Sequence, residues 1–466
     1  MTANLSTHTN SDPGVSMTDD PEIRCPASYL QESWYRAHRS IQSSHNLPLI
    51  IEVTGCADPD VLVRTLHLLA DRHEILRTSF AARDDQVCQV VRNAADVTFW
   101  SADLSRSGSP WDELLHLAAP HWQAGFSLSA GSPWRAGVVK LAERRHVVVL
   151  TLHHVLADAW STAIVARDFE RICRSLTAAC DATLPPMEIQ FGDYASWERA
   201  LSADDFDERY FEALRSCGVK QQRLPNWADD GFEMVPQPAP AVRPDAVSQL
   251  YRAFSGSDWI LASSVLTAVS ATLYPYLGGA ILIGFVSANR ARPELLPLVG
   301  PVFNYVTLPC ELRAGATVGE AVGLARREVA RASHLQVPLG LVERSLGADQ
   351  ATIFDVTVNV MKAHQDGRQA MPPPADDPTF RVRPFPLSAW SLTGDGRRFA
   401  ATSGLNFNVN MNPDGSLSPG IRYNSQLVGT DLAVRLGVSF SRALELVATS
   451  PQCGVSELLD HLIEPK

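Results

Sequence analysis

The chain has 466 residues, of which 45% are hydrophobic and 20% charged, a balance typical of a folded globular protein with large cores. Its formal net charge of −11 argues against nucleic acid and against anionic membrane surfaces as main partners. No apolar run approaches the length of a transmembrane helix and residues 1–24 hold no secretory hydrophobic region, so we expect a cytoplasmic protein with no membrane partner.

The first half of the chain shows a tail followed by strand and helix patterns. Residues 1–22 are rich in Ser, Thr, Asn and Asp, which predicts a disordered tail. Residues 57–73 carry apolar side chains at helical spacing and predict an amphipathic helix. The apolar run 146–152 predicts a buried strand, and a helix with Val165 and Phe169 on its apolar face follows it.

The second half continues the alternation of strands and helices. Residues 221–244 contain five prolines and little periodicity, which predicts a linker. Residues 281–286 predict a buried strand, residues 371–386 a surface loop, and residues 430–448 an amphipathic helix. The order predicts a mixed α/β fold in two halves, split near residue 200.

The most informative stretch lies where the strand at 146–152 ends. His153 and His154 follow that strand, and Asp158 comes four residues later, just before the next helix. A strand end holds a side chain rigidly, and a histidine with a near-neutral pKa can accept a proton from a nucleophile. Taken alone, however, this pattern is more typical of two core histidines satisfied by hydrogen bonds.

The nonapeptide from His153 to Ser161 resembles the His-His-x-x-x-Asp-Gly-Trp-Ser motif of condensation domains of nonribosomal peptide synthetases. Ala159 stands where that family usually has glycine. Other segments are similar to the family's motifs in the same order: 26–35, 72–80, 191–197, 299–304, 354–359 and 421–424. On these segments the chain is identified as a member of this family.

The resemblance implies a fold of two chloramphenicol-acetyltransferase-like subdomains arranged in a V with a central tunnel. Residues 23–200 would form the N-terminal subdomain and residues 201–466 the C-terminal one. The chain departs from the family at residues 334–340, near Pro309 and around 345–352, where familiar charged positions are missing. These departures bear on acceptor choice and loop contacts more than on the reaction.

The resemblance also implies the reaction and the roles of residues. A condensation enzyme moves an acyl group from a carrier-protein thioester to an amine or a hydroxyl. His154 would act as general base or orienting acceptor, and His153 would point into the fold. Asp158 would pair with Arg77 and serve structure, because a carboxylate near a helix start is stabilised by the backbone amides there.

The remaining candidate residues lie close to this motif or on the family's floor segment. The family glycine leaves room beside the tunnel and exposes an amide that can face the thioester oxygen, so Ala159 narrows this space. Trp160 and Ser161 are expected to pack and to cap. Asn304 fits a plain loop residue as well as a substrate contact.

The expected partners follow from the family. The enzyme would have no cofactor of its own, because the donor is carried on the phosphopantetheine arm of a separate peptidyl carrier protein. The acceptor would be a small-molecule alcohol or amine. The eight cysteines show no zinc-type spacing, so free thiols and no metal are expected. Two basic clusters are candidates for carrier docking: Arg167, Arg171 and Arg174, and Arg326, Arg327 and Arg331.

No adenylation, carrier or thioesterase region is visible, so the chain resembles the free-standing condensation enzymes of siderophore and enediyne antibiotic biosynthesis. Two alternatives stay open. One is a CoA-dependent acyltransferase of the same superfamily, although its Asp-Phe-Gly-Trp-Gly segment is not found. The other is a non-catalytic module that recruits a carrier protein or another partner, although such a module usually loses the second histidine.

Overall fold

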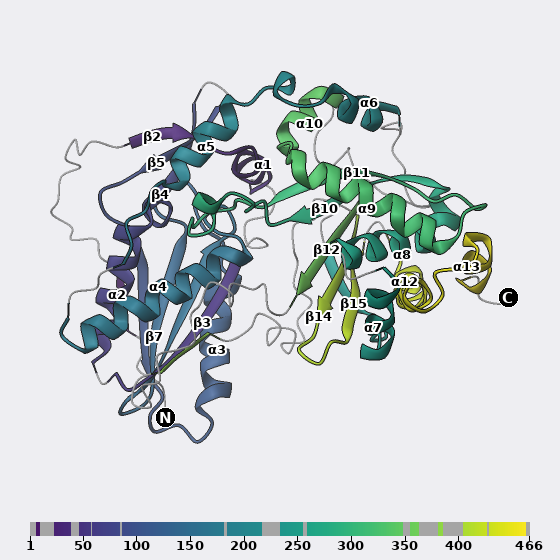
Figure 1. Ribbon diagram of the computed structural model, residues 1–466. Helices are drawn as coiled ribbons and strands as arrows, with labels where there is room; N and C mark the ends of the chain where they lie inside the picture. The colour runs from purple at the N-terminus through teal and green to yellow at the C-terminus, as the bar shows by residue number, and fades with distance from the viewer. Residues whose placement is uncertain are drawn as a thin grey trace. The chain divides into compact units, whose positions relative to one another are not determined.

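The protein is described by a computed structural model, which covers residues 6–9, 23–38, 46–56, 58–83, 86–180, 184–216, 234–254, 259–347, 355–362, 381–384, 404–425 and 428–462. The chain divides into two units (Figure 1). The first comprises Met1–Ala200, Arg290–Val302 and Asp366–Asp395; the second comprises Leu201–Asn289, Phe303–Gln365 and Gly396–Lys466. The predicted division into 23–200 and 201–466 therefore needs a correction, because the segment 290–302 belongs to the first unit.

The main sheet of the first unit has six strands in the order β1-β6-β7-β8-β3-β13. They are β1 (Ser6–Thr9), β6 (Thr98–Asp103), β7 (Trp134–Ala142), β8 (Arg145–His153), β3 (Asn46–Thr54) and β13 (Arg381–Pro384). β8 pairs antiparallel with β7 on one side and with β3 on the other, and every residue after its first is buried. This confirms the strand predicted at 146–152 and explains its unbroken apolar sequence.

Helices cover this sheet and carry the site (Figure 1). α3 (Pro110–Gln123) buries Leu114, Ala118 and Trp122 against one face of the sheet. α2 (Pro59–Arg72), which packs on α4 (Ala159–Thr177), confirms the helix predicted at 57–73. The unit also contains α1 (Tyr29–His38), α5 (Phe191–Ala200), a short 3₁₀ turn (Glu74–Arg77) and a three-stranded sheet of β2 (Ile23–Pro26), β5 (Gln86–Val91) and β4 (Thr78–Arg83).

The second unit is built around a six-stranded sheet in the order β11-β10-β12-β14-β15-β9. The strands are β11 (Asn304–Glu311), β10 (Ala280–Ser287), β12 (Val356–Lys362), β14 (Leu405–Met411), β15 (Leu417–Asn424) and β9 (Met234–Pro238). The helices are α6 (Glu208–Ser216), α7 (Pro244–Ala253), α8 (Ile260–Leu277), α9 (Val318–Leu335), α10 (Leu339–Leu346), α12 (Thr430–Thr449) and α13 (Val455–Leu462). β10 and α12 confirm the strand and the helix predicted there.

One helix of the second unit corrects an expectation about membrane segments. Among the described residues, α8 is long and apolar enough to cross a membrane, judged by length and composition only. Its residues from Ile260 to Leu273 are buried between α9, α12 and the sheet. A helix in a protein core passes the same test, because it is apolar on all sides.

Three strands lie in segments for which the sequence predicted no regular structure. β1 falls in the predicted tail, β9 in the predicted linker and β13 in the predicted surface loop. Each stands at the edge of its sheet, where one side of the backbone needs no partner and proline is tolerated, as at Pro236 and Pro384. Their hydrogen bonds come from strands distant in sequence, so local composition does not reveal them. The rest of the predicted tail lies outside the described residues.

Candidate functional site

The two histidines lie where β8 gives way to the loop before α4. His153, the last residue of β8, is buried, and its Nδ1 accepts a hydrogen bond of 3.1 Å from the Val155 N–H. Its ring meets Phe126 edge-on, with 6.2 Å between the ring centroids. His153 therefore has the contacts that a structural role requires.

His154 is the partly exposed member of the pair. Its ring lies 4.4 Å from the ring of Trp34 on α1, tilted by 52°. Burial lowers the pKa of His154 below its usual value, and the negative charge of Asp158 opposes this effect without cancelling it. The imidazole is therefore neutral at pH 7, so one ring nitrogen can accept a proton.

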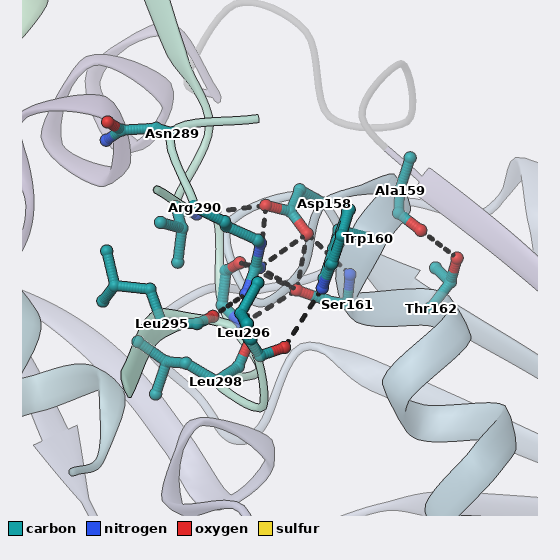
Figure 2. Close-up of polar contacts among 12 residues, drawn as sticks. Asp158, Ala159, Trp160, Ser161, Thr162, Asn289, Arg290, Leu295, Leu296 and Leu298 are labelled. Carbon is teal, nitrogen blue, oxygen red and sulfur yellow. Dashed lines mark hydrogen bonds and ion pairs between the residues drawn. The ribbon is translucent and has the colours of Figure 1, made fainter. Parts of the chain in front are cut away.

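Asp158 closes the loop by capping α4 (Figure 2). Its Oδ1 accepts hydrogen bonds from the Ser161 N–H at 2.7 Å and from the Ser161 hydroxyl at 2.6 Å. Arg290 donates from Nη2 to both carboxylate oxygens, each at 3.1 Å, and the Val302 N–H donates to Oδ2 at 3.2 Å. The expected pairing of Asp158 with Arg77 is therefore wrong.

Geometry explains why Arg290 takes this place. Its side chain is 2% exposed, and its Nη1 donates to the carbonyls of Leu295 and Leu298 at 2.5 and 2.7 Å, so the segment 290–302 curls around the guanidinium. Arg77 ends the 3₁₀ turn and instead donates to the Arg92 carbonyl at 2.5 Å and to Glu74 at 3.3 Å. Arg77 remains structural, with other partners.

Ser161 joins the histidine loop, residues 153–158, to the segment 290–302 (Figure 2). Its hydroxyl oxygen, whose one proton is directed to Asp158, lies 2.8 Å from the Gly300 carbonyl oxygen and accepts a hydrogen bond from the Gly300 N–H at 3.0 Å. A side chain at Gly300 would place Cβ only 1.8 Å from Cδ2 of Phe191, so glycine is required by this close approach. Asp158, Ser161, Arg290 and Gly300 together form the Asp158 network.

Ala159 and Trp160 open α4 directly after the cap. Ala159 is exposed, is not among the described residues with positive φ, and accepts a hydrogen bond from the Thr162 hydroxyl at 2.7 Å. The alanine in place of glycine therefore adds no backbone strain. The Trp160 indole donates to the Leu296 carbonyl at 3.1 Å, and the Arg290 guanidinium lies 5.7 Å from its ring. Trp160 and Ser161 thus make packing and capping contacts.

Asn304 lies in the second unit, at the start of β11. Its Nδ2 donates to the Val337 carbonyl at 2.7 Å, and its Oδ1 accepts from the Leu339 N–H at 3.2 Å. Both ends of the amide are bonded to the turn that leads into α10. Of the two interpretations of this residue, the contacts favour the structural one.

A second support of the loop lies on α1 and was not predicted from the sequence. Gln31 donates from Nε2 to the Val155 carbonyl at 3.0 Å. The same residue forms a capping box with Ser28, in which the Gln31 N–H donates to the Ser28 hydroxyl and the Ser28 N–H donates to Gln31 Oε1. The spacing Ser-x-x-Gln is a signal that the sequence offered.

The two basic clusters differ in their exposure. On α4, Arg167 is paired with Asp168 at 2.8 Å and Arg174 with Glu170 at 3.0 Å, with only 13% and 26% of the arginine side chains exposed. Two of the three arginines of this cluster are therefore ion-paired within α4, and Arg171 is partly exposed. On α9 the side chains of Arg326 and Arg327 are exposed.

Comparison with solved structures defines the class of protein to which this fold belongs. The X-domain from teicoplanin biosynthesis is similar over 95% of this chain and 98% of that one, with a TM-score of 0.76 and 23% identity. The SgcC5 protein from Streptomyces globisporus is similar over 92% of this chain and all of that one, with a TM-score of 0.70 and 20% identity. The first condensation domain of the CDA synthetase is similar over 93% of this chain and 98% of that one, with a TM-score of 0.66 and 20% identity, so the mixed α/β fold is that of condensation domains.

The family follows from the sequence as a whole. The model of the family described as "Condensation domain" matches residues 23–459, so the chain belongs to the condensation-domain family. One of the linear gramicidin synthase proteins from Brevibacillus parabrevis is 28% identical over 371 residues, which is 75% of this chain. The chain spans 5% of the length of that relative.

Proposed function

We propose that this protein is a condensation enzyme of natural-product biosynthesis. It transfers an acyl or aminoacyl group from a carrier-protein thioester to a hydroxyl or amine of a small acceptor, forming an ester or an amide. The observation that carries the proposal is the neutral His154 at the end of β8, placed beside Trp34 on a loop that the Asp158 network holds. Such a base can accept the nucleophile's proton as the nucleophile attacks.

The proposal assigns a role in the transfer to each of three residues of the histidine loop. His154 accepts the proton of the attacking hydroxyl or amine. The thioester C–S bond breaks as the new ester or amide bond forms, and the phosphopantetheine thiolate of the carrier protein leaves and takes up a proton. His153 and Asp158 hold the loop that carries His154. The donor arrives on the phosphopantetheine arm of a carrier protein supplied in trans, and the protein itself needs no cofactor or metal. SgcC5 is described in complex with a naphthyl ethanediol, which supports an alcohol acceptor as the finer proposal. An enediyne-type pathway is proposed on the sequence resemblance alone.

The test is an assay of the purified protein with carrier-loaded acyl donors and a panel of amines and alcohols, read by mass spectrometry of the product. Transfer that disappears in His154→Ala supports the proposal. His116→Ala is the matched control, because His116 is an exposed histidine on α3. Equal transfer from the corresponding acyl-CoA would favour the CoA-dependent alternative.

A second candidate is a module that recruits a partner without catalysis. The X-domain from teicoplanin biosynthesis, which has this fold, is described in a complex with OxyB. This role is less favoured because the chain retains His154, whereas a non-catalytic module usually lacks the second histidine. Absence of transfer with every donor and acceptor, together with binding of a pathway enzyme in a pull-down with purified proteins, would favour it.

A further inference from the structure

A buried carboxylate of α5 holds the start of α1. Glu198 Oε2 accepts a hydrogen bond of 2.8 Å from the Tyr29 N–H, the first amide of α1. Its Oε1 accepts one of 3.2 Å from the Tyr194 hydroxyl, and the residue is only 7% exposed. The first amides of a helix have no hydrogen-bond acceptor within the helix, so the Glu198 carboxylate supplies an acceptor for the first amide of α1.

α1 in turn contacts two neighbouring residues of the histidine loop, Val155 and His154. Gln31, near the start of α1, bonds to the Val155 carbonyl, and Trp34 lies against the His154 ring. Trp34 is 3% exposed, so its place is set by the helix that carries it. A change at the start of α1 is therefore transmitted to His154 by two contacts.

The charged group next to Glu198 in sequence does not neutralise it directly. Arg199 points its Nε to the Ala27 carbonyl at 2.7 Å and its Nη2 to the Glu32 carboxylate. Burial raises the pKa of Glu198 to about 7, with the Tyr194 hydroxyl and the charge of Arg199 acting in the opposite direction. Among the described residues, the titratable and charged groups around α5 include Asp193, Tyr194 and Arg199 of α5, Tyr29 and Glu32 of α1, Cys25 of β2, Glu74 of the 3₁₀ turn and Arg292, which lies over Trp197.

We propose that Glu198 is a positioning residue for the transfer reaction, whose ionised carboxylate fixes α1 so that Trp34 orients His154. This role rests on the proposed function. A carboxylate bonded to the N-terminus of a helix interacts with the helix dipole, and such an interaction is worth about 2- to 30-fold in an equilibrium constant. Protonation leaves the hydrogen bonds possible but removes the charge, so α1 is held less firmly.

The expected consequence is a rise in kcat through about pH 7 that belongs to Glu198. Glu198→Gln keeps an acceptor for the Tyr29 N–H and a donor for Tyr194, and so imitates the protonated acid at every pH. We expect its kcat at pH 8.5 to fall about three- to tenfold, to the low-pH level of the wild type. The KM for the donor should change less than about twofold, because α1 acts on the base.

The experiment measures kcat and KM between pH 5.5 and 9 for the wild type, Glu198→Gln and Glu198→Asp. Glu52→Gln is the matched control, since Glu52 is a mostly buried, ion-paired carboxylate of β3. Hydrogen–deuterium exchange of residues 28–38, corrected for the intrinsic rate at each pH, reports the firmness of α1 without any turnover. We expect protection to rise through about pH 7 in the wild type and Glu198→Asp, and not in Glu198→Gln.

The outcomes separate this role from the proposed function. A Glu198→Gln protein that melts at lower temperature but keeps the wild-type pH profile would show a merely structural residue and overturn the inference. So would unchanged exchange of α1 in that variant. A wild type that transfers no acyl group to any acceptor overturns the proposed function itself, whatever the exchange data show. A missing rise near pH 7 in an active enzyme overturns the positioning role alone.

Discussion

The Asp158 network predicts that Asp158 is energetically coupled to Arg290 and not to Arg77. Arg290→Ala empties a site in which the arginine and aspartate side chains are 2% and 5% exposed. Removing one partner of a buried ion pair costs about 3–5 kcal/mol, because the other charge stays buried. Asp158 keeps hydrogen bonds from Ser161 and Val302, so we expect the lower end, about 3 kcal/mol.

A double-mutant cycle with Asp158→Asn measures the pair itself. Nitrogen–oxygen distances of 3.1 Å place the charges in direct contact, so we expect a coupling free energy of about 2 kcal/mol between Asp158 and Arg290. Arg77→Ala is the matched control, because Arg77 is also an ion-paired arginine, with 16% of its side chain exposed. Its effect should add to that of Asp158→Asn within about 0.5 kcal/mol. Urea unfolding followed by tryptophan fluorescence and circular dichroism supplies the free energies, and a larger coupling to Arg77 than to Arg290 would refute the assignment.

The remaining predictions concern other contacts of the site. Because the pKa of Glu198 is raised to about 7, the folded protein binds this proton more tightly than the unfolded chain, in which water reaches the carboxyl. The free energy of complete unfolding should therefore lose up to about 3 kcal/mol between pH 4.5 and 7 through this group. The proposed loosening of α1 has the opposite sign, because it removes only the Tyr29 N–H from a carboxyl that stays buried on α5. Urea unfolding across this range should show that slope in the wild type and not in Glu198→Gln; equal slopes would contradict it. Gly300→Ala should lower the free energy of unfolding by about 1–3 kcal/mol, because its methyl group would clash with Phe191, and adding Phe191→Leu should restore part of this loss. If the effects of the two substitutions on the free energy of unfolding simply add, the contact between positions 300 and 191 is not responsible. Since burial lowers the pKa of His154, the fall of kcat/KM at acid pH that is due to His154 should lie below pH 6.5. His154→Ala should reduce the rate of ester formation about 10²–10⁴-fold and that of amide formation less. Unchanged ester formation in this variant would exclude His154 as the base. Ala159→Gly should change kcat/KM less than about threefold in the same assay, and a larger effect would reveal crowding by the methyl group.

Those parts of the fold that local pattern dictates were predictable from the sequence. β8 and β10 are buried apolar runs, and α2 and α12 repeat apolar residues at helical spacing. The edge strands β1, β9 and β13 were not predictable, because their partners lie far away along the chain and supply the hydrogen bonds. The same limit applies to the predicted boundary, since nothing local places the segment 290–302 in the first unit.

The candidate site likewise contains residues that the sequence predicted and one, Arg290, that it did not. The motif and the resemblance located His153, His154 and Asp158, and the helix start at Ala159 predicted the capping role of Asp158. The arginine that pairs with Asp158 could not be predicted from the sequence, because the residues around an arginine do not indicate which distant carboxylate it will contact. Arg290 is held in place by three carbonyls of its own segment, a set that exists only after the segment has folded.

The sequence separation within the Asp158 network has a consequence for folding during synthesis. Asp158 and its cation lie 132 positions apart in the chain. At a synthesis rate of about 5–20 residues per second, the ribosome adds Arg290 on the order of 10 s after Asp158. During that interval the nascent first unit has its main strands but an unneutralised carboxylate at the loop. The histidine loop is thus completed late, and a fragment ending near residue 200 would remain at this unfinished stage.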